Sequence, residues 1–527
     1  MPSAIGENGE VKTSVSARAG AEGSTSRKNS SRTVGIHTLG CRLNQFESDG
    51  IVSRFLDDGQ KYELVPLDRG PDIAIINTCT VTDQADSRSR ALVRKILRAN
   101  PLSRIVFTGC YAQTDPEKVA AIPGVFAVVG NDGKTRIKDI LEGLEERQSA
   151  TKPEAAEELN GIQTASSRGA AIFSSGALDR KKGDKKRPVL SDPFAYGDVF
   201  PVGHSRAYLK IQDGCDRKCS YCKIPRARGG GVSRSFFEIL DHVRSLDDRR
   251  IPEIVITGVN PGWYSDSGRR FNDLIRAMLS EIKYSRIRLS SIEPCDVDEE
   301  LAELSLHPRF CNYFHVPLQS GSRDILRLMR RTYSAESYRK RMETVRRVNP
   351  RAFLGTDVIA GFPGESEEHF QETLELLQDL GIIQVHAFPY SPREGTDALD
   401  LPDPVDRGLA KERVKRLQDF SARQWQTFLG GLAGESRVAV IEKWPAGSDM
   451  PATALSDDYV RMEFDTPALS DFAGNASAEL SAKVHALSNT KEGSGADSAR
   501  GRLAEFVLGQ PSGPRSVRAT PVRLLPL

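Results

Sequence analysis

The chain has 527 residues, which is enough for about three domains of ordinary size. Its 73 basic and 71 acidic residues leave a net charge of +2, which does not exclude a nucleic-acid partner because such binding depends on local patches. No apolar stretch is long enough for a membrane helix, and eight cysteines in so long a chain do not suggest a disulfide framework. We therefore expect a cytoplasmic enzyme in a reducing compartment, with no membrane partner.

The first part of the chain divides into a tail and a domain. Residues 1–32 are rich in Ser, Gly, Ala and charge, which predicts a disordered tail without the apolar core of a signal peptide. An N-terminal domain is expected over residues 33–145. Its strands are predicted at 33–39, 72–77, 104–108 and 125–129, with helices from about Phe46 to Leu56 and over 83–100. This alternation indicates an α/β fold with a doubly wound parallel sheet.

Three cysteines of this domain occupy equivalent positions. Cys41, Cys79 and Cys110 each come just after the carboxyl end of a predicted strand, and each is flanked by Gly or Thr. Ligands of open α/β sheets bind at that edge, so the three thiols should lie together there. Chance placement of buried cysteines is the alternative, but three equivalent positions favour a site for an iron–sulfur cluster.

Residues 146–204 interrupt the pattern. The segment is rich in Ala, Ser, Glu, Gly and Lys, and predicts a low-complexity, largely disordered insert between domains. Its basic run over 180–187 is interpreted as a solvated linker, with contact to RNA phosphates as the alternative.

Strand–helix alternation restarts in the region 205–428. Strands are predicted at 206–212, 253–258, 286–292, 312–317, 353–360 and 382–389. Helices are predicted at 233–248, 270–283, 297–305, 322–348 with a break near Thr332, 366–380 and 405–428. Six such strands are enough for a partial (β/α)6 barrel, whose active site should lie at the carboxyl ends of the strands.

A second group of cysteines follows the first of these strands. Cys215, Cys219 and Cys222 lie within eight residues. A [4Fe–4S] cluster needs four ligands, so three cysteines would leave one iron open to a ligand that is not protein. A structural zinc site would require a fourth ligand at its own spacing, and a redox-active or merely buried group of thiols is the remaining alternative.

The region 429–527 changes character. Short strands are predicted at 437–442, 459–464 and 502–507, separated by loops rich in Ser, Asp and Gly. The pattern indicates a small antiparallel β-barrel, a fold that often binds oligonucleotides, although any small β domain would give the same signal.

The combined motifs make the chain resemble the radical S-adenosylmethionine methylthiotransferase family over almost all of its ordered length. The motifs that carry the resemblance are Thr38-Leu-Gly-Cys41, Ile76-Asn-Thr-Cys79, Thr108-Gly-Cys110, Cys215-x3-Cys219-Ser-Tyr-Cys222, Thr257-Gly-Val-Asn260, Ser290-Ser-Ile-Glu-Pro294, Pro317-Leu-Gln-Ser-Gly-Ser322, Gly361-Phe-Pro-Gly-Glu365 and Tyr390-Ser-Pro-Arg. The Asn-Gln-Phe-Glu-Ser run that begins at Asn44 is similar to the branch that modifies N6-threonylcarbamoyladenosine at position 37 of tRNA. Departures from the family pattern include Pro261 and the long insert.

The resemblance implies two [4Fe–4S] clusters as cofactors. Cys215, Cys219 and Cys222 would hold the cluster that binds S-adenosylmethionine and cleaves it to a radical, while Cys41, Cys79 and Cys110 would hold a second cluster that carries the sulfur. The enzyme would transfer a methylthio group to carbon 2 of the adenine, with two S-adenosylmethionine molecules and no separate catalytic side chain. The alternatives are N6-isopentenyladenosine of tRNA and an aspartate of a small-subunit ribosomal protein.

The resemblance also implies contacts and partners. S-adenosylmethionine contacts are expected from five residues at the strand ends, with an ordinary salt bridge as the alternative for the two charged ones. These residues are Asn260, Ser291, Glu293, Gln319 and Arg323. The expected partners are tRNA, an electron donor of the flavodoxin or ferredoxin type and a sulfur donor, and the 429–527 region would be an RNA-binding domain similar to the family's TRAM domain.

Overall fold

The computed structural model describes residues 31–59, 61–79, 84–149, 170–173, 192–444, 450–465 and 500–525. The chain forms two compact units. The N-terminal unit contains the chain up to Gly203 together with 213–217 and 223–232, and the C-terminal unit contains the rest. Nearly all of the predicted tail and most of the predicted 146–204 insert, including its basic run, lie outside the described residues.

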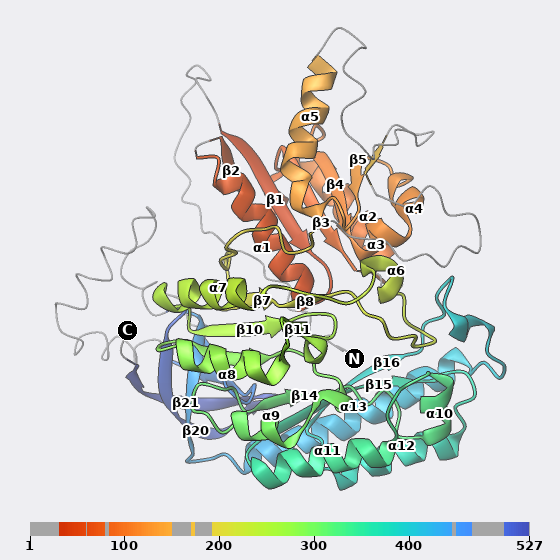
Figure 1. The fold of residues 1–527 in the computed structure, drawn as a ribbon, viewed down its shortest axis with the longest axis vertical. Helices are drawn as coiled ribbons and strands as arrows, with labels where there is room; N and C mark the ends of the chain where they lie inside the picture. The colour runs from red at the N-terminus through yellow and green to blue at the C-terminus, as the bar shows by residue number, and fades with distance from the viewer. Residues whose placement is uncertain are drawn as a thin grey trace. The chain divides into compact units, whose positions relative to one another are not determined.

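The N-terminal unit is built on a six-stranded parallel sheet in the order β2-β1-β3-β4-β5-β6 (Figure 1). The strands are β1 (Arg32–Thr38), β2 (Tyr62–Leu64), β3 (Ile73–Thr78), β4 (Arg104–Gly109), β5 (Val125–Val129) and β6 (Ala171–Phe173). The four strands expected from the sequence are confirmed. The short edge strands β2 and β6 were not expected, and β6 comes from within the 146–204 region.

Helices cover both faces of this sheet, so the doubly wound arrangement is confirmed. On one face, α1 (Arg42–Leu56) packs beside α5 (Ile137–Ser149). On the other, α2 (Gln84–Ala99) and α4 (Pro116–Ala120) close a core around buried strand residues such as Ile76 and Phe107. Strand β3 is buried along its whole length, as expected for a continuous apolar run in a parallel sheet.

The C-terminal unit contains two parallel three-stranded sheets, β13-β10-β7 and β14-β15-β16. The strands are β7 (Ala207–Lys210), β10 (Glu253–Thr257), β13 (Arg286–Leu289), β14 (Tyr313–His315), β15 (Phe353–Ala360) and β16 (Gln384–Pro389). Parallel bridges from Ile287 to Phe310 and from Ser291 to His315 join the two sheets. The six predicted strands thus form one curved parallel array, and the partial (β/α)6 barrel is confirmed.

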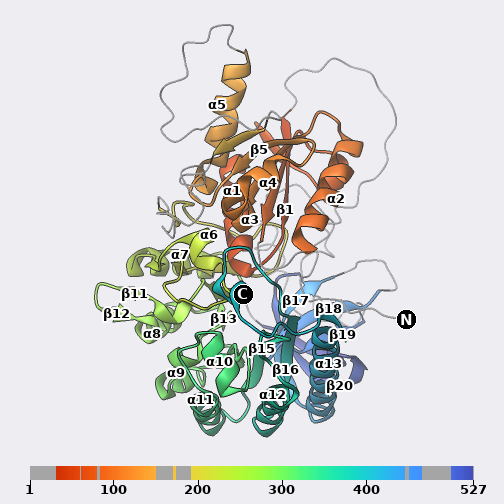
Figure 2. The same ribbon diagram turned by 90° about the vertical axis from the view of Figure 1, so that its right-hand side faces the viewer.

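Helices alternate with these strands and lie outside them, and Figure 2 shows α11, α12 and α13 next to one another. They are α7 (Phe236–Asp248), α8 (Phe271–Glu281), α9 (Glu299–Leu304), α10 (Arg323–Leu328), α11 (Ala335–Val348), α12 (Glu367–Asp379) and α13 (Arg407–Gly430). The break predicted near Thr332 separates α10 from α11, which begins at a Ser334 capping box. No helix in the described part of the chain is long and apolar enough to cross a membrane.

The last described segments form a closed five-stranded barrel in the order β17-β18-β19-β21-β20. Its strands are β17 (Ser436–Lys443), β18 (Ala452–Ser456), β19 (Arg461–Phe464), β20 (Leu503–Gly513) and β21 (Ser516–Leu524). The small barrel is confirmed, but the sequence predicted only β17, β19 and β20 of its five strands, and not β18 or β21. The barrel also differs from a purely antiparallel one, because β19 and β21 pair in parallel.

A buried carboxylate joins this small barrel to the partial (β/α)6 barrel. Glu253 pairs with Arg286 and Arg288, and all three side chains are at most 6% exposed. The same guanidinium groups donate to backbone carbonyls of the small barrel, Arg286 to Leu455 over 2.9 Å and Arg288 to Ser456 over 2.7 Å. Apolar packing continues this seam, in which Trp425 of α13 contacts the core of the small barrel.

Candidate iron–sulfur sites

The three N-terminal cysteines lie at one edge of the sheet, as the sequence predicts. Cys41 follows β1, Cys79 follows β3, and Cys110 begins α3 (Cys110–Thr114) directly after β4. Because β1, β3 and β4 are neighbours in the sheet, their carboxyl ends bring the three thiols to the same place. None of the three forms a disulfide with another described cysteine.

Two glycines allow these strand ends to come close together. Gly40 has a φ of 115°, and a Cβ there would lie 2.6 Å from Cβ of Cys79 and 3.1 Å from its Sγ. Gly109 has a φ of 96°, and a Cβ there would lie 2.2 Å from the carbonyl oxygen of Thr78. Any larger residue would push the cysteine-bearing turns apart, which explains physically why Gly precedes both Cys41 and Cys110.

The thiols differ in exposure in a way that suits a ligand bound at the surface of the edge. Cys41 is exposed, Cys79 is half-buried and Cys110 is buried. Although the Cys41 side chain reaches solvent, surrounding protein removes part of its water. This desolvation raises the pKa of the Cys41 thiol, while the Arg228 guanidinium lowers it and Cys110 raises it again, so the three groups are in electrostatic reach of one another.

Three thiols are a donor set of the kind that holds an iron–sulfur cluster. Within the described residues, no group of three His, Cys, Asp or Glu side chains is close enough to hold one ion. A four-iron cluster spans a larger space than one ion, so its thiolate ligands stand further apart, and three thiols leave one iron without a protein ligand.

Buried amides beside Cys110 have hydrogen-bonding capacity left over. Asn131 donates from Nδ2 to the Ala227 carbonyl over 2.8 Å and lies 4.0 Å from Sγ of Cys110. Its Oδ1 and the Oδ1 of Asn77 are buried, and neither has a hydrogen-bond partner in the described ranges. Unsatisfied polar atoms of this kind are uncommon in folded cores and are typical of places where a ligand or water completes the network.

A buried network of charges lies behind this edge. Arg228, in α6 (Ile224–Arg228), donates to the carboxylates of Glu47 over 2.8 Å and Asp213 over 3.0 Å, and to Oδ1 of Asn44 over 2.7 Å. Lys134 pairs with the second oxygen of Glu47 over 2.5 Å. The four charged side chains are at most 3% exposed. Two cations and two anions make the net charge of this network zero, and this charge balance allows the four side chains to be buried.

The second cysteine motif begins in the N-terminal unit. The backbone N–H of Cys215 donates to the Gly229 carbonyl over 3.1 Å, and its Sγ accepts from the backbone N–H of Arg217 over 3.4 Å. A backbone N–H aimed at a cysteine sulfur is typical of iron–sulfur sites, because it stabilises negative charge on the thiolate.

Cys219 and Cys222 belong to the C-terminal unit. The Cys222 N–H donates to the Cys219 carbonyl over 3.2 Å. This bond closes a tight turn, so both cysteines lie in one short loop. Sγ of Cys219 accepts from Nη1 of Arg331 over 3.3 Å, and Nη2 of Arg331 pairs with Glu293. Nε of Arg331 donates to the Tyr333 hydroxyl over 3.1 Å, so the whole guanidinium group is held in place.

The five expected S-adenosylmethionine contacts occupy different environments. Asn260, beyond β10, is buried, and neither its Oδ1 nor its Nδ2 has a hydrogen-bond partner in the part of the chain that is described. Gln319 has a φ of 66°, a strained conformation for a residue with a side chain, and its N–H donates to the Asp357 carbonyl over 2.8 Å. Ser291 is exposed where the two sheets of the barrel join.

The two charged residues of that set are not equivalent. Glu293 has an ion pair, as the salt-bridge alternative anticipates, but its partner is Arg331. Arg323 is exposed at the start of α10. Sequence reasoning therefore missed Arg331. The Arg-Arg pair at 330–331, just before the predicted helix break, was the only local signal for it.

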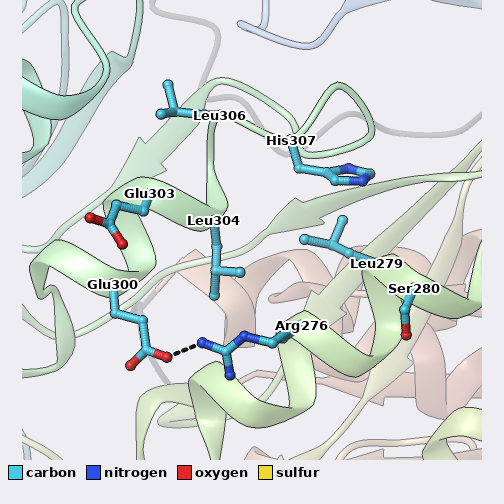
Figure 3. Close-up of a pocket in the computed structure, with 8 residues that line it drawn as sticks. All are labelled: Arg276, Leu279, Ser280, Glu300, Glu303, Leu304, Leu306 and His307. Atoms are coloured by element: carbon cyan, nitrogen blue, oxygen red, sulfur yellow. Dashed lines mark hydrogen bonds and ion pairs between the residues drawn. The ribbon is translucent and has the colours of Figure 1, made fainter.

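A separate hollow lies on the C-terminal unit between α8 and α9 (Figure 3). It has a volume of about 570 Å³, and the Arg276–Glu300 ion pair lies at its side. It is lined by Arg276, Leu279, Ser280, Glu300, Glu303, Leu304, Leu306 and His307. None of the motif cysteines lines it, so it is not part of the candidate sites.

Two family models match the chain. Residues 33–130 match the uncharacterized protein family UPF0004, and residues 209–377 match the radical SAM superfamily. These ranges contain the first and the second group of three cysteines, respectively.

Curated relatives match over most of their length. The "Threonylcarbamoyladenosine tRNA methylthiotransferase MtaB" of Bacillus subtilis is 36% identical over 392 residues, which is 73% of this chain and 79% of the relative. The protein of the same name from Aquifex aeolicus is 35% identical over 78% of this chain and 93% of the relative. The "tRNA-2-methylthio-N(6)-dimethylallyladenosine synthase" of Cereibacter sphaeroides is 29% identical over 78% of this chain and 88% of the relative.

Proposed function

Because the chain belongs to the radical S-adenosylmethionine tRNA methylthiotransferase family, we propose that it transfers a methylthio group to carbon 2 of N6-threonylcarbamoyladenosine at position 37 of tRNA. The observation that carries this proposal is the gathering of Cys41, Cys79 and Cys110 at one sheet edge in a chain that also contains the radical-type cysteine motif. Two groups of three cysteines in one chain match a reaction that needs one site to form a radical and another to supply a sulfur atom.

Each group of cysteines has a role in this proposal. Cys215, Cys219 and Cys222 hold the [4Fe–4S] cluster that binds S-adenosylmethionine, and Cys41, Cys79 and Cys110 hold the second cluster. When bound, the two clusters and two S-adenosylmethionine molecules supply the radical, the sulfur and its methyl group. The protein's own residues bind these groups, orient the adenine and exclude water.

The polar residues at the barrel rim bind S-adenosylmethionine in this proposal. Asn260 offers a buried amide whose donor and acceptor are both available, a property that suits the polar groups of a small molecule. Ser291, Glu293 and Gln319 lie at or beyond strand ends, where ligands of barrel enzymes bind. For Arg323 the support is weaker than for Arg331, which already contacts a motif cysteine.

The choice of nucleoside rests on the relatives. Those with the higher identities are named for threonylcarbamoyladenosine, while a relative at 29% identity is named for dimethylallyladenosine. The threonylcarbamoyl nucleoside is therefore the first choice, and the isopentenyl (dimethylallyl) nucleoside is the second. The ribosomal-protein aspartate has no supporting relative among those described above.

The proposed partners are tRNA, an electron donor and a sulfur donor. The closed β17–β21 barrel provides a surface for tRNA, and a small electron-transfer protein of the flavodoxin or ferredoxin type reduces the cluster of Cys215. A separate sulfur donor reloads the second cluster. Cysteines at exposed and half-exposed positions that form no disulfide within the described residues suit a reducing compartment such as the cytoplasm.

Nucleoside mass spectrometry tests the substrate. In a strain that lacks the gene, 2-methylthio-N6-threonylcarbamoyladenosine should disappear from tRNA while its precursor accumulates. Unchanged levels of the modified nucleoside would contradict the proposal, and loss of the 2-methylthio-isopentenyl nucleoside instead would identify the alternative.

Iron analysis tests the two-cluster site separately. The anaerobically reconstituted protein should contain about eight irons per chain, and Cys79→Ala should lower this to about four. Cys295→Ala is the matched control, because Cys295 is exposed and lies outside both motifs. Four irons in the unaltered protein, unchanged by Cys79→Ala, would remove the second cluster from the proposal.

A further inference from the structure

The buried charge network around Arg228 joins segments that are far apart in the sequence. Arg228 is 181 residues from Glu47 and 184 from Asn44, and it also bonds to Asp213. Glu47 and Asn44 belong to α1, the helix that begins immediately after Cys41. Asp213 lies two residues before Cys215. One guanidinium group thus contacts the segments that carry both groups of cysteines.

Asn44 extends the network to the turns of the first group. Its Nδ2 donates to the carbonyl of Leu39 over 3.0 Å and to that of Thr78 over 3.1 Å. Leu39 lies two residues before Cys41, and Thr78 immediately precedes Cys79. The side chain that accepts from Arg228 therefore also fixes the two strand ends where Cys41 and Cys79 lie.

Helix α6 makes a second contact with the same edge. The carbonyl of Ala227, the neighbour of Arg228, accepts the Asn131 side-chain amide, which lies beside Cys110. The Asp213 carboxylate, which accepts from Arg228, also accepts a hydrogen bond from the backbone N–H of Gly214 over 2.8 Å, and Gly214 immediately precedes Cys215. Contacts from Ala227 and Arg228 thus reach all three turns of the first cysteine group and the start of the second.

Stability alone does not explain such a network. Removing four charges from water costs several kcal/mol per ion, and well-packed apolar side chains of similar volume often stabilise a protein as well or better. In some proteins, a buried and paired set of charges instead selects one arrangement of the segments that carry it, because a shift separates a charge from its partner.

We propose that Arg228 is a positioning residue that locks the edge bearing Cys41, Cys79 and Cys110 to the segment that begins the Cys215 motif, so that radical formation and sulfur transfer stay coupled. The coupling of the two reactions rests on the proposed function. The contacts that hold the two segments together involve only residues of the N-terminal unit. Loss of the lock should let S-adenosylmethionine be cleaved without transfer of the methylthio group.

The experiment compares Arg228→Met with Arg226→Met in the full-length, anaerobically reconstituted protein. Arg226 is on the same short helix but is exposed, so it controls for the loss of a positive charge. The readout is the ratio of 5′-deoxyadenosine to methylthiolated nucleoside. We expect this ratio to rise at least tenfold in Arg228→Met, to stay within about twofold of the unaltered protein in Arg226→Met, and to be partly restored in Arg228→Lys.

A second variant keeps the test decisive if Arg228→Met folds poorly. Arg228→Met combined with Asp213→Asn removes one charge of each sign and leaves the Lys134–Glu47 pair in place. This variant should fold and still show the raised ratio. Equal loss of both products in either variant, with an unchanged ratio, would overturn the proposal.

A spectroscopic measurement distinguishes failure of this proposal from failure of the proposed function. In protein that also carries Cys215→Ala, Cys219→Ala and Cys222→Ala, only the first cysteine group remains. Arg228→Met should then lower the iron content at least twofold or change the electron paramagnetic resonance spectrum of the reduced cluster. This result is expected even if the substrate is another nucleoside, and an unchanged iron content and spectrum would overturn the lock.

Discussion

Arg331 donates a hydrogen bond from Nη1 to Sγ of Cys219 over 3.3 Å and forms an ion pair with Glu293 through Nη2. The Arg331 side chain is only 4% exposed, so its charge acts on the sulfur through little water. Glu293 and the Tyr333 hydroxyl hold it in this position. A motif cysteine therefore has a fixed cation beside it before any cofactor is considered.

Arg331→Met should make the proposed cluster on the Cys215 motif harder to reduce. Hydrogen bonds and positive charge near a cluster sulfur stabilise the reduced, more negative state. Their loss should lower the reduction potential by on the order of tens of millivolts, where about 59 mV is a tenfold change in a one-electron equilibrium. A redox titration followed by electron paramagnetic resonance measures this shift.

Arg330→Met is the control for this measurement. Arg330 is the adjacent residue, but it is exposed and pairs with Asp397. Its replacement should leave the potential unchanged. An equal shift in both variants would mean that Arg331 acts only through the general charge of the protein.

Glu253→Gln should destabilise the C-terminal unit strongly. Burial opposes ionisation of this carboxyl, but Arg288 and Arg286 outweigh that effect and hold the pKa of Glu253 well below its ordinary value. Removing one partner of a buried pair leaves unpaired charge and costs about 3–5 kcal/mol. Urea denaturation at pH 7 measures this loss. Glu300→Gln, which breaks the exposed pair with Arg276, should cost no more than about 1 kcal/mol.

The lowered pKa of Glu253 should make the stability of the protein depend on pH. A group whose pKa is lower in the folded state adds stability above its unfolded pKa, about 4.3 for Glu, and loses it as the pH falls towards the folded pKa. The difference in stability between the unaltered protein and Glu253→Gln should therefore be largest near neutral pH and shrink below about pH 4. A difference that grows on acidification would contradict this assignment.

Local sequence pattern was sufficient for most of the fold. The continuous apolar run at 72–77 and the alternation from 206 onwards predict strands whose ends lie within three residues of those observed, because burial and periodicity are local properties. Once these strands are predicted, the clustering of the three strand-end cysteines follows, since the carboxyl ends of parallel strands lie at the same edge of a sheet. Strand β6 has only three residues and lies in a polar segment, so no periodic signal could identify it.

Long-range side-chain pairing could not be predicted in the same way. Nothing local relates Arg228 to a glutamate 181 residues away. Similarly, the sequence places several arginines around α10, at 323, 327, 330 and 331. Which of them turns towards Cys219 depends on the backbone between α10 and α11, where Arg330 has a φ of 55°. The parallel pairing of β19 with β21 depends on barrel closure and not on either strand alone.

Gly40→Ala should disrupt the first cysteine group specifically. The added methyl would lie 2.6 Å from Cβ of Cys79, and the φ of 115° is unfavourable for any residue with a side chain. About half of the bound iron should be lost if each group holds one cluster. Gly59→Ala is the matched control, because Gly59 also has a positive φ of 68° but a Cβ there would meet no atom within 4 Å. Equal iron content in the two variants would contradict the close approach as the cause.

Asn260→Ala should weaken S-adenosylmethionine binding without weakening the fold. Both polar atoms of the Asn260 amide are buried, and in the described ranges neither has a hydrogen-bond partner, so their removal takes no internal hydrogen bond from the protein. If they bind S-adenosylmethionine, the dissociation constant should rise about tenfold, equivalent to about 1.4 kcal/mol. Equilibrium dialysis and thermal unfolding of the same preparation measure the two effects.

Asn349→Ala gives the opposite pattern and serves as the control. The Asn349 amide is also buried, but it donates to Ser305 over 3.0 Å and to Asn312 over 2.8 Å. Its loss leaves buried acceptors unsatisfied and should cost about 1–3 kcal/mol of stability while S-adenosylmethionine binding is unchanged. If Asn260→Ala instead loses stability and keeps its affinity, Asn260 is a structural residue and the S-adenosylmethionine contact assigned to it is wrong.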